Sequence, residues 1–284
     1  MTAGVSFHLI ILSMQSHLRR PIALPQDHGS WVFILSPLLV GLFAGGRFSA
    51  ASLALVIAAM AAFLIRQPVT MAVKAYAGRR PRTDLPAARF WVVVYGVIIL
   101  LALGYLIARG FTYVLFLAVP GAPVFAWHLV LVSKRAERRQ AGVEILATGV
   151  LALAAPAAFW VGLGHYAAEG WWLWLWTWLQ SSGSIVYAYL RLEQREQAKV
   201  QTRSEAWRMG QRAFLYTSFN LALALLLGWT NLQPQWIFLP FLIQWAETVW
   251  GITHPAAGWK PTAIGIRQLI VSTLWTILFI LCWR

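Results

Sequence analysis

Glu247 is the residue whose position in this sequence most directly suggests chemistry. It lies well inside an apolar run, FLIQWAETVWGITHP, in a chain that has nine acidic residues in all. A carboxyl group inside a membrane segment is costly unless it is protonated, paired or in a wet cavity, so we interpret it as a functional site. The alternative is a structural hydrogen bond to a neighbouring helix, with Gln244 one turn earlier on the same face.

Arginine and lysine side chains gather where apolar runs end, and they suggest phosphate binding. One stretch is LIRQPVTMAVKAYAGRRPR and a second is SIVYAYLRLEQREQAKVQTR, in which Tyr187 and Arg191 stand one helical turn apart. Guanidinium forks match phosphate oxygens, so we hypothesise that these side chains bind a lipid or polyprenyl phosphate headgroup. The simpler interpretation is that the cations set the topology and contact anionic lipid. The predicted headgroup ligands are Arg66, Lys74, Tyr187, Arg191, Lys260 and Arg267.

A third polar cluster stands directly before an apolar run, in LPQDHGSWVFILSP (residues 24–37). Asp27 or Ser30 can cap the helix that follows, which leaves His28 without a structural role. His28 titrates near neutrality, so it and Glu193 are the candidates for an acid or base. The cluster predicts the rim of a cytoplasm-facing cavity, and it leaves open whether the protein is an enzyme.

The remaining histidines do not predict a cofactor. His28, His128 and His254 lie near one predicted membrane level, where paired histidines could hold a haem, but no histidine pair has the spacing of one helix face. The chain also lacks an HExxH motif, a Cys-rich metal spacing, a phosphate-binding GxxxxGK[ST] loop and an aspartate-rich DxxxD run. We therefore predict no metal and no cofactor, and we count His128 with Gln244 and Glu247 as intramembrane polar residues.

The elements that hold these residues are predicted to be membrane helices. Hydrophobic residues form 60% of the chain and charged residues 11%, whereas soluble domains have about 25% charged residues. Apolar runs of about 18 residues or more are typical of membrane helices, and the sequence has about nine runs of roughly this kind. We predict an all-α polytopic membrane protein with spans near Ser30–Gly45, Phe48–Ile65, Phe90–Ala108, Phe111–Val132, Val143–Leu163, Trp171–Leu190, Ala213–Thr230, Trp236–Ile252 and Ile264–Trp283.

The charge distribution predicts the orientation of these spans. If the connections alternate between the two sides, every Lys and Arg except Arg47, Arg109 and Arg284 falls on the side of the N-terminus. The positive-inside rule then places the N-terminus in the cytoplasm and the C-terminus outside. The net charge of +14 therefore indicates anionic membrane lipids rather than nucleic acid as partners, and it leaves protein partners unspecified.

Domain organisation follows from the same pattern. Residues 1–23 are predicted to form a cytoplasmic or interfacial segment, with Met1 or Met14 as the natural start, and residues 24–284 a single transmembrane helical domain. Long cytoplasmic connections are expected at Arg66–Arg89 and Arg191–Arg212, and chemistry is expected on that face.

The segment PQDHGSW, followed by an apolar run with a proline, resembles the N-terminal signature of YwiC-like membrane proteins. The later RQP, YLRLEQR and KPTAIGIRQ segments are similar to the pattern of the same family, so the resemblance runs from about Leu24 to the end. It implies an integral protein of the bacterial cytoplasmic membrane whose activity is not established.

A more distant likeness is architectural. Nine spans with long cytoplasmic loops after spans two and six resemble the UbiA prenyltransferase superfamily, whose loops carry aspartate-rich motifs that bind magnesium diphosphate. This chain departs there, because the first loop holds only Asp84 and the second holds Glu193, Glu196 and Glu205.

Three functions remain open on the sequence. The first is a lipid-site protein that acts on or binds a polyprenyl (isoprenoid) or phospholipid headgroup. The second is a small-molecule or ion transporter in which Glu247 and the polar residues Gln180, Asn220 and Gln244 line a path, although nine spans do not divide into equal repeats. The third is a non-catalytic membrane assembly factor.

Overall fold

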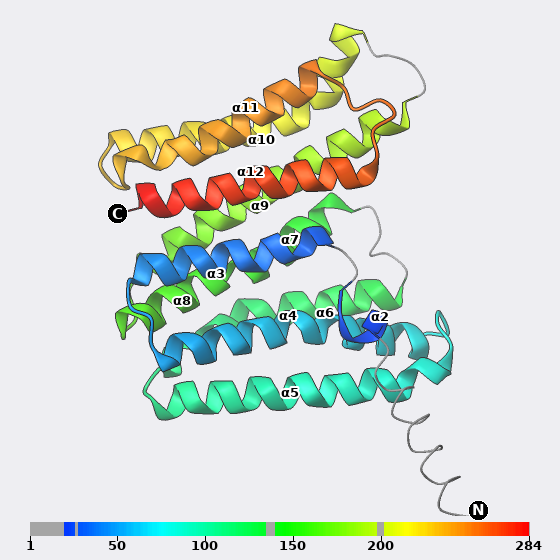
Figure 1. Ribbon diagram of the computed structural model, residues 1–284, viewed down its shortest axis with the longest axis vertical. Coiled ribbons are helices and arrows are strands. Elements are labelled where there is room, and N and C mark those ends of the chain that lie inside the picture. The colour runs from blue at the N-terminus through cyan, green and yellow to red at the C-terminus, as the bar shows by residue number, and fades with distance from the viewer. Residues whose placement is uncertain (1–19, 26–27, 135–139, 198–201, 284) are drawn as a thin grey trace, which may run out of the picture. The chain divides into compact units, whose positions relative to one another are not determined.

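The computed structural model describes residues 20–25, 28–134, 140–197 and 202–283, and in these ranges every regular element is a helix (Figure 1). The predicted class, an all-α polytopic membrane protein, is confirmed. In chain order the elements are α2 (Arg20–Ala23), η1 (His28–Trp31), α3 (Val32–Gly45), α4 (Ala50–Tyr76), η2 (Arg82–Asp84), α5 (Leu85–Ala108), η3 (Thr112–Leu117), α6 (Ala118–Ser133), α7 (Ala141–Ala152), α8 (Ala154–Leu163), α9 (Gly170–Glu196), α10 (Arg203–Trp229), η4 (Gln235–Ile237), α11 (Phe238–Thr253) and α12 (Pro261–Cys282).

The helices form two compact units. Unit 1 comprises Met1–His28 and Ser49–Arg138, and unit 2 comprises Gly29–Phe48 and Arg139–Arg284. Most of the segment 1–23 lies outside the described residues, and the single domain over residues 24–284 stays a prediction.

Unit 1 is built on the long antiparallel pair α4 and α5, with α6 packed against α4. The short helix α2 lies on both of them, where Ile22 packs against Ala87 and Ala88. The Tyr95 hydroxyl donates a hydrogen bond of 3.1 Å to the Ala23 carbonyl, so a polar contact as well as an apolar one holds α2 in place.

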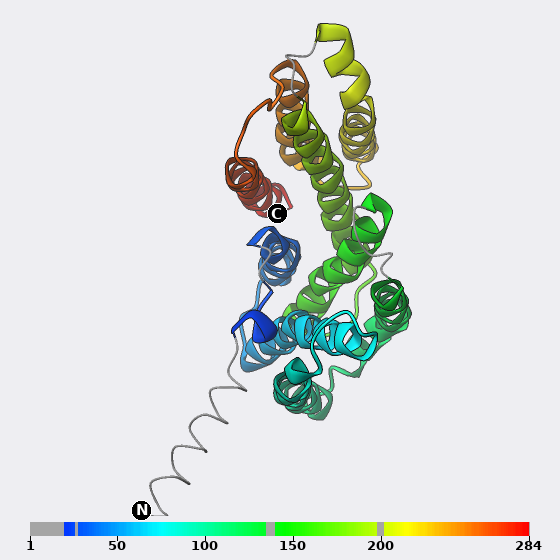
Figure 2. The ribbon, with the colours of Figure 1, turned by 90° about the vertical axis from the view of Figure 1, so that its right-hand side faces the viewer.

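Unit 2 is arranged around α9. This helix packs against α3, α7, α8, α10, α11 and α12, and Figure 2 shows it running through the middle of these helices. Any side chain on α9 therefore faces a neighbouring helix or a space between helices.

Small residues allow α3 and α8 to approach closely. Gly41 and Gly45 form a GxxxG pair on α3, and a Cβ atom at Gly41 would overlap the Ala155 carbonyl of α8. A Cβ at Gly162 would come within 2.9 Å of Gly45. Backbone contact of this kind is how helices associate in membranes, where apolar burial alone gives no preference for helix over lipid.

Each of the nine expected spans coincides with one helical segment, but the structure supports fewer crossings by length and composition. Within the described residues, six helices are long and apolar enough to cross a membrane, and α3 is a shorter apolar helix. Of the other two segments, α11 has only 16 residues and α9 contains a run of serine and glutamine. The count of nine crossings and their orientation stay predictions.

The two long connections expected from the sequence are largely helical, so this prediction is wrong. Helix α4 continues past Ile65 to Tyr76, and α9 continues to Glu196 before α10 starts at Arg203. The reason is local, because these stretches are rich in helix-forming Arg, Lys, Glu, Gln and Ala. At the start of α10, a capping box between Thr202 and Glu205 begins the helix at Arg203, nine residues before Arg212, where the expected connection ends.

We expect Gly41→Ala to destabilise unit 2 by about 1–3 kcal/mol, because the added methyl group must push α3 away from α8. Unfolding of the purified protein in detergent would measure the change. Gly104→Ala on α5 is the control, since a Cβ there meets no atom within 4 Å. Equal stability of the two variants would contradict the close packing.

The predicted orientation can be tested in a Cys282→Ala background, because Cys282 is the only cysteine of the chain. We expect Ala257→Cys, in the basic α11–α12 connection, to react with a membrane-impermeant maleimide only from the cytoplasmic side. Arg47→Cys, after α3, should react only from the outside. Both positions are exposed in unit 2, and labelling of both from one side would refute the alternation.

Candidate functional site

Helix α9 presents a polar face to α11. Tyr187, Arg191 and Gln194 follow one another at intervals of four and three residues, which places them on one side of the helix. All three are buried, and they meet α11 at Gly251, where a Cβ atom would overlap the Tyr187 ring and hydroxyl.

Glu247 is the acceptor at the centre of this interface. The Tyr187 hydroxyl donates to its Oε1 at 2.8 Å, while Arg267 of α12 donates from Nε to Oε1 at 2.5 Å and from Nη2 to Oε2 at 2.8 Å. The side chain of Glu247 is 10% exposed and that of Arg267 is 35% exposed. A bidentate pair of this kind satisfies both carboxylate oxygens and joins three helices.

Arg191 forms hydrogen bonds with the backbone at the end of α11. It is 1% exposed, and its Nη1 donates to the carbonyls of Gly251 and His254, each at 2.7 Å, and to Gln194 Oε1 at 2.9 Å. Gln194 Oε1 also accepts from the Ala256 amide at 3.3 Å. These bonds hold the connection between α11 and α12 against the end of α9.

Aromatic rings enclose both guanidinium groups. The Arg191 guanidinium lies 5.5 Å from the Trp250 ring and 5.1 Å from the Trp259 ring, and that of Arg267 lies 3.5 Å from the Trp250 ring. His254 stacks on Trp250 with centroids 4.9 Å apart. Cation–π contacts are stronger when the cation is desolvated, so the rings help to stabilise the buried charge of Arg191 and the partly exposed charge of Arg267.

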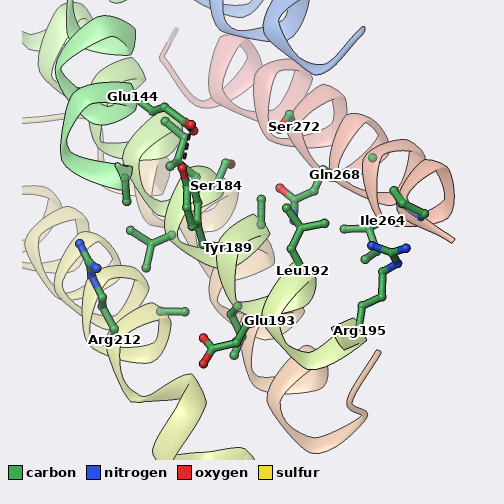
Figure 3. A pocket seen from close by; sticks show the side chains of 18 of the residues that line it. Glu144, Ser184, Tyr189, Leu192, Glu193, Arg195, Arg212, Ile264, Gln268 and Ser272 are labelled. Carbon is green, nitrogen blue, oxygen red and sulfur yellow. Dashed lines mark hydrogen bonds between the residues drawn. The ribbon is translucent and has the colours of Figure 1, made fainter. Parts of the chain in front are cut away.

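The opposite side of α9 borders a cavity of about 890 Å³ within unit 2 (Figure 3). Helices α3, α7, α10 and α12 supply its other walls, which are mainly apolar. Towards the end of α9 the cavity is bordered by side chains of both charges. The charged lining residues are Glu144, Glu193, Arg195, Glu196 and Arg212.

Two of these charged residues flank α9. The Arg195 Nε donates to the Trp259 carbonyl at 2.9 Å, which brings its guanidinium to the start of α12 at Pro261. Arg212 lies on the α10 side together with Glu193, and within the described residues these two side chains form no ion pair. Arg195 and Arg212 are therefore the cations best placed to meet a ligand in the cavity.

The inner part of the cavity ends on a buried hydrogen-bond network. The Gln180 Nε2 donates to Ser184 Oγ at 3.0 Å and to Ser272 Oγ at 3.2 Å, and both serines line the cavity. The Gln244 Nε2 donates to the Gln180 carbonyl at 2.8 Å and to Ser184 Oγ at 3.1 Å. Gln244 thus bonds to α9 rather than to Glu247.

The structure brings only some of the predicted site residues together. Tyr187, Arg191, Arg267, Gln244 and Glu247 share the α9–α11–α12 interface, and Glu193 borders the cavity. Lys260 is exposed as the residue that precedes α12.

The other predicted residues lie in unit 1, which is described separately. Arg66 and Lys74 are on α4, where the Arg66 guanidinium lies 5.1 Å from the Phe63 ring. His128 is on α6. His28 begins η1, and its side chain lies outside the described residues.

The ligands predicted from the sequence omit Arg195 and Arg212, which border the cavity, and also the rings that lie beside the arginines. Arg195 follows Arg191 by one turn, which was a usable signal for it. Trp250 and Trp259 gave no signal of their own, because tryptophan is common at the ends of all membrane helices.

The sequence model of the YwiC-like protein family matches residues 24–159. Over these residues the chain is YwiC-like. The match confirms the predicted family over these residues and includes the segment around His28, while the YLRLEQR and KPTAIGIRQ segments of the chain lie beyond it. No curated protein and no solved structure matches the chain, and the UbiA-like architecture stays a prediction.

We expect Glu247 and Arg267 to be strongly coupled in stability. A double-mutant cycle of Glu247→Gln and Arg267→Gln should give a coupling free energy of about 1–3 kcal/mol, because either change breaks a short bidentate pair of charged groups. Unfolding in detergent would measure it. Arg80 and Asp84, 3.7 Å apart in an i, i+4 pair, are the control, with an expected coupling below about 0.5 kcal/mol. Equal coupling in both cycles would contradict a central role for the Glu247 pair.

Proposed function

We propose that this YwiC-like membrane protein binds a lipid or polyprenyl phosphate in the cavity beside α9, with the headgroup at the end of that helix. The observation that carries the proposal is the cavity of about 890 Å³, whose volume is in the range of ligand sites. Its apolar walls suit a hydrocarbon chain, and its cations suit a phosphate. The apolar lining residues include Val32, Phe33, Ile185, Leu192, Ile264 and Leu269.

Arg195 is the best candidate for the first phosphate ligand. Its guanidinium is oriented by the Trp259 carbonyl, so it is ordered before a ligand arrives. The N-terminus of α12 lies beside it and adds the partial positive charge of a helix start. Gln268, about two turns along α12 from its start, can donate a hydrogen bond.

The proposal gives different roles to the cations suggested by the sequence. Arg191 and Arg267 are bonded to carbonyls and to Glu247, so they hold the helices that form the site. A contribution from Lys260 remains part of the proposal, and the phosphate-binding roles of Arg66 and Lys74 in unit 1 stay predictions from the sequence. So does the placement of the site at the cytoplasmic face of a bacterial inner membrane, for which the gathering of basic residues is the support.

Transport is the second candidate, and one observation favours it. Among the described residues, Asn220 Oδ1 and Gln244 Oε1 are buried without a hydrogen-bond partner. Both amides lie beside Gly183, where a Cβ would come within 3.3 Å of Asn220 and 2.9 Å of Gln244. Unsatisfied buried acceptors are places where water or a polar solute binds.

Native mass spectrometry of the purified protein tests the lipid proposal. We expect co-purified lipid in the wild type and at least about tenfold weaker retention in Arg195→Ala, since a charge-assisted hydrogen bond contributes roughly 1.5–3 kcal/mol. Arg208→Ala is the matched control, because Arg208 is an exposed arginine that does not line the cavity. Retention that is equal in all three proteins, or absent from the wild type, would refute the proposal.

A further inference from the structure

The lipid cavity continues into a second, apolar groove. The groove has a volume of about 370 Å³ and lies between α3 and α12 in unit 2. Val32, Leu269 and Ser272 line both spaces, so the groove and the cavity meet at these residues. The other groove-lining residues are Leu35, Ser36, Leu39, Phe43, Thr273, Thr276, Ile277, Ile280 and Leu281.

Together the two spaces follow one face of α12 along almost its whole length. The lining positions on this helix recur at intervals of three and four residues from Pro261 to Leu281. At a rise of about 1.5 Å per residue this path is about 30 Å long. The hydrocarbon core of a bilayer is also about 30 Å thick. The length of the path is therefore about twice the hydrocarbon thickness of one leaflet.

The polar groups at the floor of the groove are hydrogen-bonded within the protein. Ser36 and Thr276 share a hydrogen bond of 2.6 Å across the α3–α12 contact, and Thr276 also donates to the Ser272 carbonyl. These hydroxyl groups are satisfied by the protein, so the groove offers an apolar ligand mainly carbon surface. The same bond holds α3 against α12 below the groove.

We propose that the ligand is a lipid phosphate with a single hydrocarbon chain longer than one leaflet, and that this chain lies along the α3–α12 groove. The inference rests on the proposed function, since it places the phosphate at Arg195. A phospholipid acyl chain that starts at this level ends near the mid-plane and would leave the part of the groove beside Phe43 and Leu281 unfilled. A longer chain covers that apolar surface, and each buried methylene adds to affinity.

Three probes that all carry a phosphate monoester test the chain: decaprenyl phosphate, decyl phosphate and dioleoyl phosphatidic acid. We expect decaprenyl phosphate to bind the full-length protein in detergent most tightly, by at least about tenfold over the other two. Thr273→Trp should fill the groove and weaken decaprenyl phosphate by about tenfold or more while leaving decyl phosphate unchanged. Leu274→Trp is the matched control, since Leu274 is 46% exposed and lines neither space.

The outcomes separate the two proposals. If decaprenyl phosphate binds no better than the other probes, or if Thr273→Trp and Leu274→Trp bind it equally, the chain inference is wrong. The headgroup proposal stands in that case as long as Arg195→Ala weakens decyl phosphate. If Arg195→Ala leaves all three probes unchanged, the headgroup proposal fails, and the chain inference fails with it. Unchanged decyl phosphate binding also shows that Thr273→Trp is folded.

Discussion

A charged side chain inside an apolar helical bundle needs a partner within the protein, because lipid offers none. Unit 2 is organised by this constraint. Glu247 of α11 accepts hydrogen bonds from Tyr187 of α9 and from Arg267 of α12, so one carboxylate connects three helices. Arg191 adds the backbone after α11 to the same assembly. Pairing of this kind says little about net stability, but it selects one arrangement of the helices over others.

The two sides of α9 therefore have different roles in the proposed function. On the side that faces α11, the polar side chains of α9 form hydrogen bonds with other groups of the protein. On the other side, Arg195 and Glu193 border the cavity. The two sides are connected through Trp259, whose carbonyl accepts from Arg195 and whose ring lies over Arg191. A ligand that contacts Arg195 would therefore bind next to Trp259, whose ring packs on the buried Arg191.

Close packing elsewhere in unit 2 shapes the space that a chain could fill. The GxxxG pair of α3 lies against α8, and this contact leaves the opposite side of α3 to border α12. Small residues thus set the position of one groove wall, and the hydrogen bond between Ser36 and Thr276 sets the distance to the other. The apolar groove is a product of both contacts and is not visible in the hydropathy of either helix.

Composition and periodicity were enough to establish the class of this protein and the approximate position of each helical segment. The resemblance of the PQDHGSW segment indicated the family whose model matches residues 24–159. The class and the helix positions are local properties, because lipid solubility and helix formation depend on short windows of sequence. Local propensity was also the reason that the expected long connections turned out to be helical. The i, i+4 spacing of Tyr187 and Arg191 correctly placed them on one face.

Only the tertiary structure decided which partners these residues meet. Arg191 and Arg267 were predicted from the sequence as phosphate ligands, and nothing in their spacing reveals that Nη1 of Arg191 donates to carbonyls or that Arg267 pairs with Glu247. The cavity and the groove likewise depend on how α3, α9 and α12 pack. The physical reason is that desolvation and pairing depend on distances of a few ångströms between helices that are far apart in the chain.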